Sequence, residues 1–197
     1  MINIDTLLAW GATFRKIAPN EIIFREGTEC HFYYQLVSGS VRWININDAG
    51  CEFIQYMIEP GESFGEIPLF DDSLYAATAV GNSVSVIVRL HKSNFRQVIK
   101  EQSEIHFKFT RLLAERLRFK FLLLKELSCF GPEHRISSLF NYFKESRKNL
   151  CINCTQIRLT RQQIANMTGL RVETVIRAIR GLHEKGILTI DKGKVYC

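Results

Sequence analysis

The sequence predicts an α+β protein in three successive parts: an antiparallel β domain, a long helix, and a small helical domain that ends in a β hairpin. Short apolar segments separated by glycine turns fill residues 13–90. Apolar residues then recur every three or four positions between 105 and 127, and two short helical patterns joined by Gly169 precede the C-terminal β segments. A chain of 197 residues has room for two small domains. We place the three parts at residues 1–100, 101–129 and 130–197.

The first part has the pattern of an antiparallel sandwich or barrel. Its apolar runs are rich in β-branched and aromatic residues and are separated by glycine-containing turns, which is typical of that architecture. The runs are Glu21–Phe24, Phe32–Val37, Val41–Ile46, Phe53–Ile58 and Val84–Leu90. In the run 41–46 each face mixes apolar and polar residues, so the strand is predicted more firmly than the side that it buries.

The second part predicts one long helix. Its apolar stripe extends over more than six turns and consists of Ile105, Phe109, Leu113, Leu117, Phe121 and Leu124. Such a stripe suits the seam of a homodimer in which two helices pack as in a coiled coil. The alternative, a helix packed only within its own chain, remains open. Pro132 then stops this helix and begins another.

The third part contains a helix-turn-helix pattern. Thr160 with Gln163 three residues later forms a capping box that starts a helix. Gly169 provides the permissive backbone for a short turn. A second helix follows from Val172, and the segment 186–197 predicts a two-stranded wing around a glycine turn.

The second helix of this pair carries groups that can read a DNA major groove. Arg177 can donate two hydrogen bonds to a guanine, Glu173 can accept one from a cytosine, and Val172 offers apolar contact to a thymine methyl group. Both charged residues lie in the N-terminal half of the helix, which approaches base edges in this motif. The residues expected to hold phosphates are Thr160, Arg161, Gln162, Thr174 and Arg180. An ordinary surface pair between Glu173 and Arg177 is the alternative.

Basic residues are concentrated near the C-terminus. Residues 1–128 hold 14 Lys and Arg against 15 Asp and Glu, whereas residues 129–197 hold 12 against 5. The net charges of these segments are therefore −1 and +7, within a total of +6. A basic segment attached to a nearly neutral body is typical of proteins that bind a phosphate backbone. A merely solvated basic surface would give the same count.

These parts together resemble the Crp/Fnr superfamily of transcription regulators. Members combine a cyclic-nucleotide-binding-type β-roll (jelly-roll) sensor domain, a dimerisation helix and a winged helix-turn-helix. The segment 172–177 is similar to the Fnr-type recognition helix, with Val172 where the cyclic-AMP-receptor branch has Arg. The resemblance implies that Glu173 and Arg177 read bases in an inverted repeat similar to TTGAY…RTCAA. It also implies a homodimer that binds double-stranded DNA, contacts RNA polymerase and responds to a small-molecule effector. Arg171 departs from the family's usual Ser or Thr.

The β domain resembles the family in its glycines and in the segment 64–70, which is similar to the opening of the phosphate-binding cassette. The resemblance implies an effector pocket formed by Gly65, Glu66, Ile67, Tyr75, Ala76, Lys120 and Phe121. In cyclic-nucleotide binders the cassette continues to an Arg-Ser pair, whereas this chain has Tyr75-Ala76. Without the guanidinium there is no bidentate charge for the cyclic phosphate, so we do not expect cyclic AMP to bind. The effector stays unknown, and the Fnr-type iron–sulfur cluster is not expected because its N-terminal cysteines are absent.

The six cysteines are scattered, and only Cys151 and Cys154 have a spacing that redox or metal chemistry favours. Zinc needs four ligands and no second pair follows, so ordinary thiols are the first interpretation, with a redox or metal role left open. The five histidines share no ligand-like spacing, and no metal site is expected.

Other classes of function find little support. No run of 18 or more apolar residues occurs and the N-terminus lacks a signal peptide, so we expect a cytoplasmic protein. No nucleophile–base pair, carboxylate pair or phosphate-binding glycine loop with Lys is visible, so we do not expect an enzyme. The remaining alternative is a cyclic-nucleotide-type small-molecule-binding module whose C-terminal domain acts through protein interaction.

Overall fold

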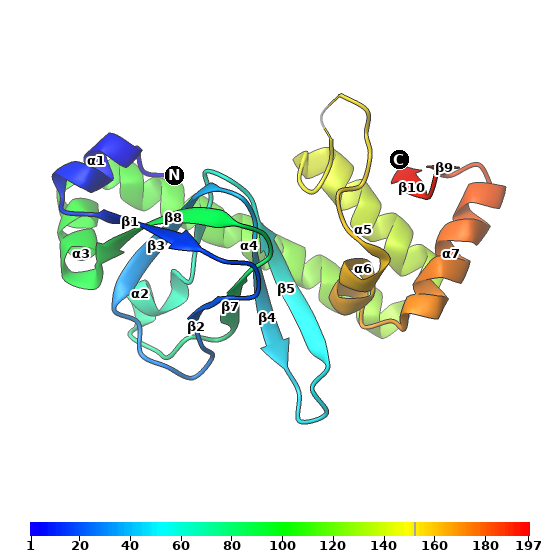
Figure 1. Cartoon of the computed structure of the whole chain (residues 1–197), viewed down its shortest axis with the longest axis horizontal. Coiled ribbons are helices and arrows are strands. Elements are labelled where there is room, and N and C mark those ends of the chain that lie inside the picture. The colour runs from blue at the N-terminus through cyan, green and yellow to red at the C-terminus, as the bar shows by residue number, and fades with distance from the viewer. Residues whose placement is uncertain (152) are drawn as a thin grey trace. The chain divides into compact units, whose positions relative to one another are not determined.

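The computed structural model describes residues 1–151 and 153–197, and the chain divides into two compact units, Met1–Ala114 and Glu115–Cys197 (Figure 1). The predicted α+β class is confirmed: an antiparallel β domain precedes a long helix and a helical domain with a β hairpin. No helix of the described residues is long and apolar enough to cross a membrane.

The first unit contains two four-stranded antiparallel sheets (Figure 1). One sheet has the order β1-β8-β3-β6 and the other β2-β7-β4-β5. The strands are β1 (Thr13–Ile17), β2 (Ile22–Phe24), β3 (Phe32–Ser38), β4 (Val41–Ile46), β5 (Glu52–Ile58), β6 (Ser63–Phe64), β7 (Thr78–Gly81) and β8 (Ser85–His91). The helices are α1 (Ile4–Ala9), α2 (Ile67–Asp71), α3 (Lys92–Glu101) and the first part of α4 (Ser103–Cys129). Helices α1, α2 and α3 were not predicted from the sequence.

A register shift explains the ambiguous facing of β4. The pairing of β4 with β5 slips between Trp43 and Ile44, so that these two consecutive residues are both buried. An irregularity of this kind breaks the period of two from which a buried face is read. The neighbouring turn at Gly39 requires glycine, because a Cβ there would lie 2.3 Å from the hydroxyl oxygen of Ser85.

The start of α4 belongs to the core of the first unit. Phe109 is fully buried, and its ring lies edge-on to Tyr33 and Phe95 at centroid distances of 5.8 and 5.3 Å. Tyr33 and Phe95 themselves stack at 4.8 Å. Ile105 is buried as well. The prediction that Ile105 and Phe109 line a dimer seam is therefore wrong for these two side chains, because the β domain of their own unit covers this end of the stripe.

The second unit packs its helices around an apolar core. It consists of the rest of α4, α5 (Pro132–Ser146), α6 (Arg161–Thr168), α7 (Val172–Glu184), β9 (Thr189–Asp191) and β10 (Lys194–Tyr196). α5 begins at Pro132, as expected for a residue that lacks an N–H donor. Its buried residues are Ile136, Leu139, Phe140 and Phe143. α4 contributes Phe119, whose ring stacks on Tyr142 at 4.4 Å.

Candidate nucleic-acid interface and effector region

The helix-turn-helix forms as its local sequence predicts. The hydroxyl of Thr160 accepts from the Gln163 amide at 3.1 Å, and the Gln163 side chain accepts from the Thr160 amide at 2.9 Å. This reciprocal capping box satisfies two backbone donors at the start of α6. At the other end, Gly169 ends the helix with φ +65°, a conformation that glycine adopts without strain. The capping box and the glycine turn together fix where α7 begins.

α7 divides into a buried face and an exposed charged face. The buried residues are Val175, Ala178, Ile179 and Leu182. Glu173, Arg177 and Arg180 are exposed, and Val172 and Thr174 are half-buried. In the described part of the chain, Glu173 and Arg177 make no ion pair with each other. The surface-pair interpretation is therefore not what the structure shows, and both side chains keep their polar groups for another partner.

Close packing holds α7 on α5. A Cβ at Gly181 would lie 2.6 Å from a carboxylate oxygen of Glu133, so glycine allows the two helices to approach. Glu133 also forms an ion pair with Lys185, one turn further along α7. The packing of α7 against α5 thus fixes the orientation of the exposed face of α7.

The residues predicted to hold phosphates lie at the start of α6 and along α7. Thr160, Gln162 and Arg180 are exposed, whereas Arg161 is half-buried. Gln162 donates to the Asn166 side chain at 2.8 Å. Arg161 donates to the carbonyl of Gly193 at 3.2 Å and therefore also ties α6 to the wing. Burial lowers the pKa of the Arg161 guanidinium from its ordinary value.

The wing adds two cations that the sequence analysis did not single out. β9 and β10 pair around a turn in which Lys192 and Gly193 both have positive φ, of 45° and 77°. Two successive residues of this kind form the tight turn that two-residue β hairpins favour. Lys192 and Lys194 are both exposed. A lysine on each side of a predicted glycine turn was the signal that could have identified them.

Aromatic side chains fill the part of the first unit that resembles the phosphate-binding cassette. The ring of Tyr75 stacks on Phe24 with a centroid distance of 3.8 Å and an angle of 12°. Gly65 lies directly against this pair, because a Cβ there would be 2.5 Å from Phe24 and 3.1 Å from Tyr75. Phe24 also stacks on Phe64 at 6.0 Å. Tyr75 is therefore part of a packed aromatic cluster.

Cations lie near the Tyr34 side of this cluster, where the charges of Arg89 and Arg15 oppose the effect of burial on the pKa of Tyr34. Burial, and then the neighbouring Cys30 thiol, raise the pKa of the Tyr75 phenol, which stays neutral. Glu66 is fully buried, Ile67 is half-buried at the start of α2, and Ala76 is exposed. The Ala76 carbonyl accepts from the Asn45 side chain at 2.9 Å.

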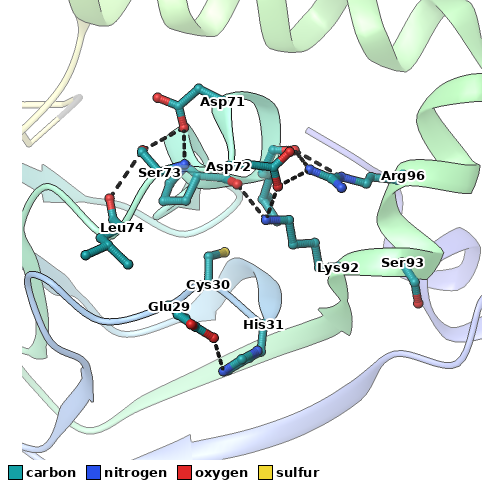
Figure 2. Close-up of polar contacts among 12 residues, drawn as sticks. Glu29, Cys30, His31, Asp71, Asp72, Ser73, Leu74, Lys92, Ser93 and Arg96 are labelled. Atoms are coloured by element: carbon teal, nitrogen blue, oxygen red, sulfur yellow. Dashed lines mark hydrogen bonds and ion pairs between the residues drawn. The ribbon is translucent and has the colours of Figure 1, made fainter.

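Two cations of α3, Lys92 and Arg96, are bound to protein groups (Figure 2). Asp72 accepts from Lys92 at 2.7 Å and from Arg96 at 2.6 Å. Lys92 also donates to the carbonyl of Pro68 at 2.9 Å, so α3 holds the end of α2. Lys92, and then Arg96, hold the pKa of the Asp72 carboxyl below its usual range.

The other effector candidates, Lys120 and Phe121, belong to the second unit. Lys120 is half-buried, and burial, together with repulsion from Arg116, lowers the pKa of its ammonium group to about 8. Phe121 is 62% exposed. Phe121 is therefore exposed like Leu117 and Leu124, which are 55% and 62% exposed on the same helix. Leu113, a further residue of the predicted seam, is half-buried.

Comparison with known proteins identifies both ends of the chain. The cyclic nucleotide-binding domain family matches residues 14–102, and the Crp-like helix-turn-helix domain family matches residues 134–196. The cAMP-activated global transcriptional regulator CRP of Haemophilus influenzae is 29% identical, over 93% of this chain and 84% of its own length.

Solved structures show the same fold. FixK2 of Bradyrhizobium japonicum aligns with a TM-score of 0.79 and 23% identity, over 94% of this chain and 91% of its own. The c-di-GMP responsive global regulator CLP of Xanthomonas campestris also gives a TM-score of 0.79, at 21% identity, over 98% of this chain and 96% of its own.

Proposed function

Because the chain belongs to the Crp/Fnr family of DNA-binding transcription regulators, we propose that it acts as a homodimer that reads an inverted-repeat DNA site through α7. The observation that carries this proposal is the exposed face of α7. Glu173, Arg177 and Arg180 stand on one side of a helix whose other side is packed into the second unit. A helix held in this way can enter a major groove with its polar groups still available.

The chemistry of this face assigns a role to each side chain. Arg177 reads a guanine through two parallel hydrogen bonds, and Glu173 accepts from a cytosine amino group. Val172 favours a thymine methyl at the adjacent position. Phosphate contacts by Thr160, Arg161, Gln162, Thr174 and Arg180 set the register of the helix in the groove. Lys192 and Lys194 extend these phosphate contacts to the wing.

The second half of the α4 stripe supports dimerisation. Leu117, Phe121 and Leu124 are all more than half exposed, on one face of a helix. Large apolar side chains grouped in this way suit the seam of a parallel pair of helices. Two copies would present two α7 helices to two half-sites, which an inverted repeat requires.

The sensor domain responds to an effector other than cyclic AMP. The Tyr75–Phe24 stack stands where the family's cyclic-nucleotide binders place an Arg, and the nearby Lys92 and Arg96 are bound to Asp72. An anionic phosphate would therefore meet an aromatic ring at this position and would have to compete with Asp72 for these two cations. We also propose that the protein contacts RNA polymerase, as membership of the family implies.

Selection from randomised double-stranded DNA with the full-length chain tests the proposal. We expect an enriched motif with two-fold symmetry that resembles TTGAY…RTCAA. Enrichment of an asymmetric motif, or of no motif, would contradict reading by a dimer. A control chain with Glu173→Ala and Arg177→Ala retains the basic surface of α6 and the wing and should bind DNA without enriching a sequence.

A further inference from the structure

Cys151 and Cys154 lie in a part of the second unit where the chain on either side of them is paired. Leu150 and Ile157 form an antiparallel bridge. Next to it, the Cys151 amide donates to the carbonyl of Gln156 at 2.8 Å. The carbonyl of Cys151 accepts from the Thr155 amide at 2.9 Å. These bonds turn the chain back on itself and place residues 151 and 154 on one hydrogen-bonded turn.

Hydrogen-bond donors converge on the sulfur of Cys151. The Cys154 thiol and the backbone amides of Asn153 and Cys154 donate to it, and the Arg158 side chain adds a further bond. Donors of this kind stabilise a thiolate more than a thiol. They lower the pKa of Cys151 to about 7, and the Cys154 thiol contributes most. Cys151 is half-buried and Cys154 is exposed, so a small reagent can reach both sulfurs.

A metal site fits these thiols less well than thiol exchange. A structural zinc ion needs four ligands, and the described residues contain no group of three His, Cys, Asp or Glu that could hold a metal. Two thiols on one hydrogen-bonded turn need no further ligand to form a disulfide, whose S–S bond is about 2.05 Å long.

This paired part of the chain is connected to the wing that we assign to DNA binding. Gln156 bridges to Tyr196 of β10, and the Ile157 amide donates to the carbonyl of Val195 at 2.9 Å. The Cys197 amide donates to the carbonyl of Thr155 at 3.3 Å. A covalent change at residues 151 and 154 therefore occurs in an extension of the wing sheet.

We propose that Cys151 and Cys154 form a thiol–disulfide exchange site that reacts with low-molecular-weight disulfides. The Cys151 thiolate attacks one sulfur of the disulfide, whose S–S bond breaks and releases one thiolate, which takes up a proton from solvent. Cys154 then loses its proton to solvent and attacks the Cys151 sulfur of the mixed disulfide. The second small thiolate leaves, so two protein thiols are oxidised as one disulfide is reduced to two thiols. The reverse exchange with a small thiol restores the two protein thiols.

Oxidised glutathione tests this proposal on the full-length chain. After trapping and peptide mass mapping, we expect a disulfide between Cys151 and Cys154 in the native chain. The Cys154→Ser variant should accumulate glutathione on Cys151, because no second thiol resolves the mixed disulfide. The Cys151→Ser variant should react at Cys154 much more slowly. Cys129→Ser, which removes an exposed cysteine in the same unit, is the matched control and should leave the exchange unchanged.

The pH dependence of alkylation supplies a second measurement that does not require a disulfide. At pH 7, Cys151 should react roughly three- to six-fold faster in the folded chain than in urea, after allowance for the lower nucleophilicity of a low-pKa thiolate. Its rate in the folded chain should level off above about pH 8, while the rate in urea continues to rise.

Three results would overturn the proposal. The first is an equal alkylation rate for Cys151 in the folded and unfolded chain at pH 7. The second is the absence of a disulfide between Cys151 and Cys154 after treatment with oxidised glutathione. The third is a disulfide that joins either of these residues to Cys197 instead. Circular dichroism of the serine variants, compared with the native chain, ensures that a lost reaction reflects the lost thiol.

Discussion

The exposed face of α7 and the cassette region of the β domain differ in how their polar groups are used. On α7, Glu173 and Arg177 make no ion pair with each other in the described part of the chain, so their charges remain available. In the cassette region, Tyr75 is stacked on Phe24, and Lys92 and Arg96 are bound to Asp72. Both regions belong to folds that the family shares. The family fold is therefore present in both regions, but the charged groups are exposed on α7, whereas Lys92 and Arg96 of the cassette region are paired within the protein.

This difference matters because the Haemophilus influenzae relative is named as a cAMP-activated regulator. A shared β-roll does not by itself imply a shared ligand, and we propose that an aromatic ring stands here in place of the group that binds the cyclic phosphate. A recognition helix, in contrast, retains its function as long as its exposed side chains and its support remain.

The largest expected effect is loss of the proposed dimer. Replacing Leu117 and Leu124 with Glu should place unpaired charges in a desolvated seam, at a cost of several kcal/mol, and yield monomers. Light scattering measures the mass directly. Leu8→Glu, which changes an exposed leucine on α1, is the matched control and should leave the dimer intact. A double variant that remains a dimer would place the seam elsewhere.

The next effect concerns the two arginines of α7. Arg177→Ala should cost about 1–3 kcal/mol on the preferred site and relax the preference at one base pair, because it removes a bidentate base contact. Arg180→Ala should weaken binding to all sequences alike and reduce the slope of log K against log salt by about 1. Fluorescence anisotropy with matched and mismatched sites separates the two patterns. If the patterns were exchanged, the register of α7 in the groove would differ from the one proposed.

The helix-turn-helix could be predicted from the sequence because its signals are local. The capping box of Thr160 and Gln163 and the turn at Gly169 depend on residues a few positions apart, and the structure confirms both. The strands and the long helix followed equally well from their periodicity.

The packing between distant segments could not be predicted from the sequence. Phe24 and Tyr75 are fifty-one positions apart, and no local pattern reports that their rings stack. The apolar stripe of α4 likewise does not say which partner covers it, so Phe109 was assigned to a seam although Tyr33 and Phe95 cover it. The buried side of β4 could not be predicted because its pairing with β5 shifts register after Trp43.

A smaller effect tests the cassette region by restoring charge. The native chain should bind cyclic AMP no more tightly than about 1 mM in calorimetry. Tyr75→Arg combined with Ala76→Ser removes the stacked ring and returns a guanidinium, so we expect at least roughly tenfold tighter binding, the gain of one charge-assisted hydrogen bond. Tyr75→Phe keeps the ring without the charge and should show no gain. Micromolar affinity of the native chain would mean that the phosphate is held by other groups.

The smallest effect concerns Asp72, which binds the two cations of α3. Lys92 and Arg96 hold the folded-state pKa of this carboxyl below its unfolded value, so the ion pairs stabilise the fold above the unfolded pKa of about 3.9. That stabilisation is lost as the pH falls through the folded pKa, where the carboxyl becomes protonated. Asp72→Asn should therefore lower the melting temperature slightly at pH 7 and should match the native chain once the pH is well below 3.9. Asp48→Asn, on the exposed turn between β4 and β5, controls for the loss of one negative charge. A difference between the Asp72 variant and the native chain that stayed constant from pH 7 to acid would show that Asp72 acts through its hydrogen-bond geometry and not through its charge.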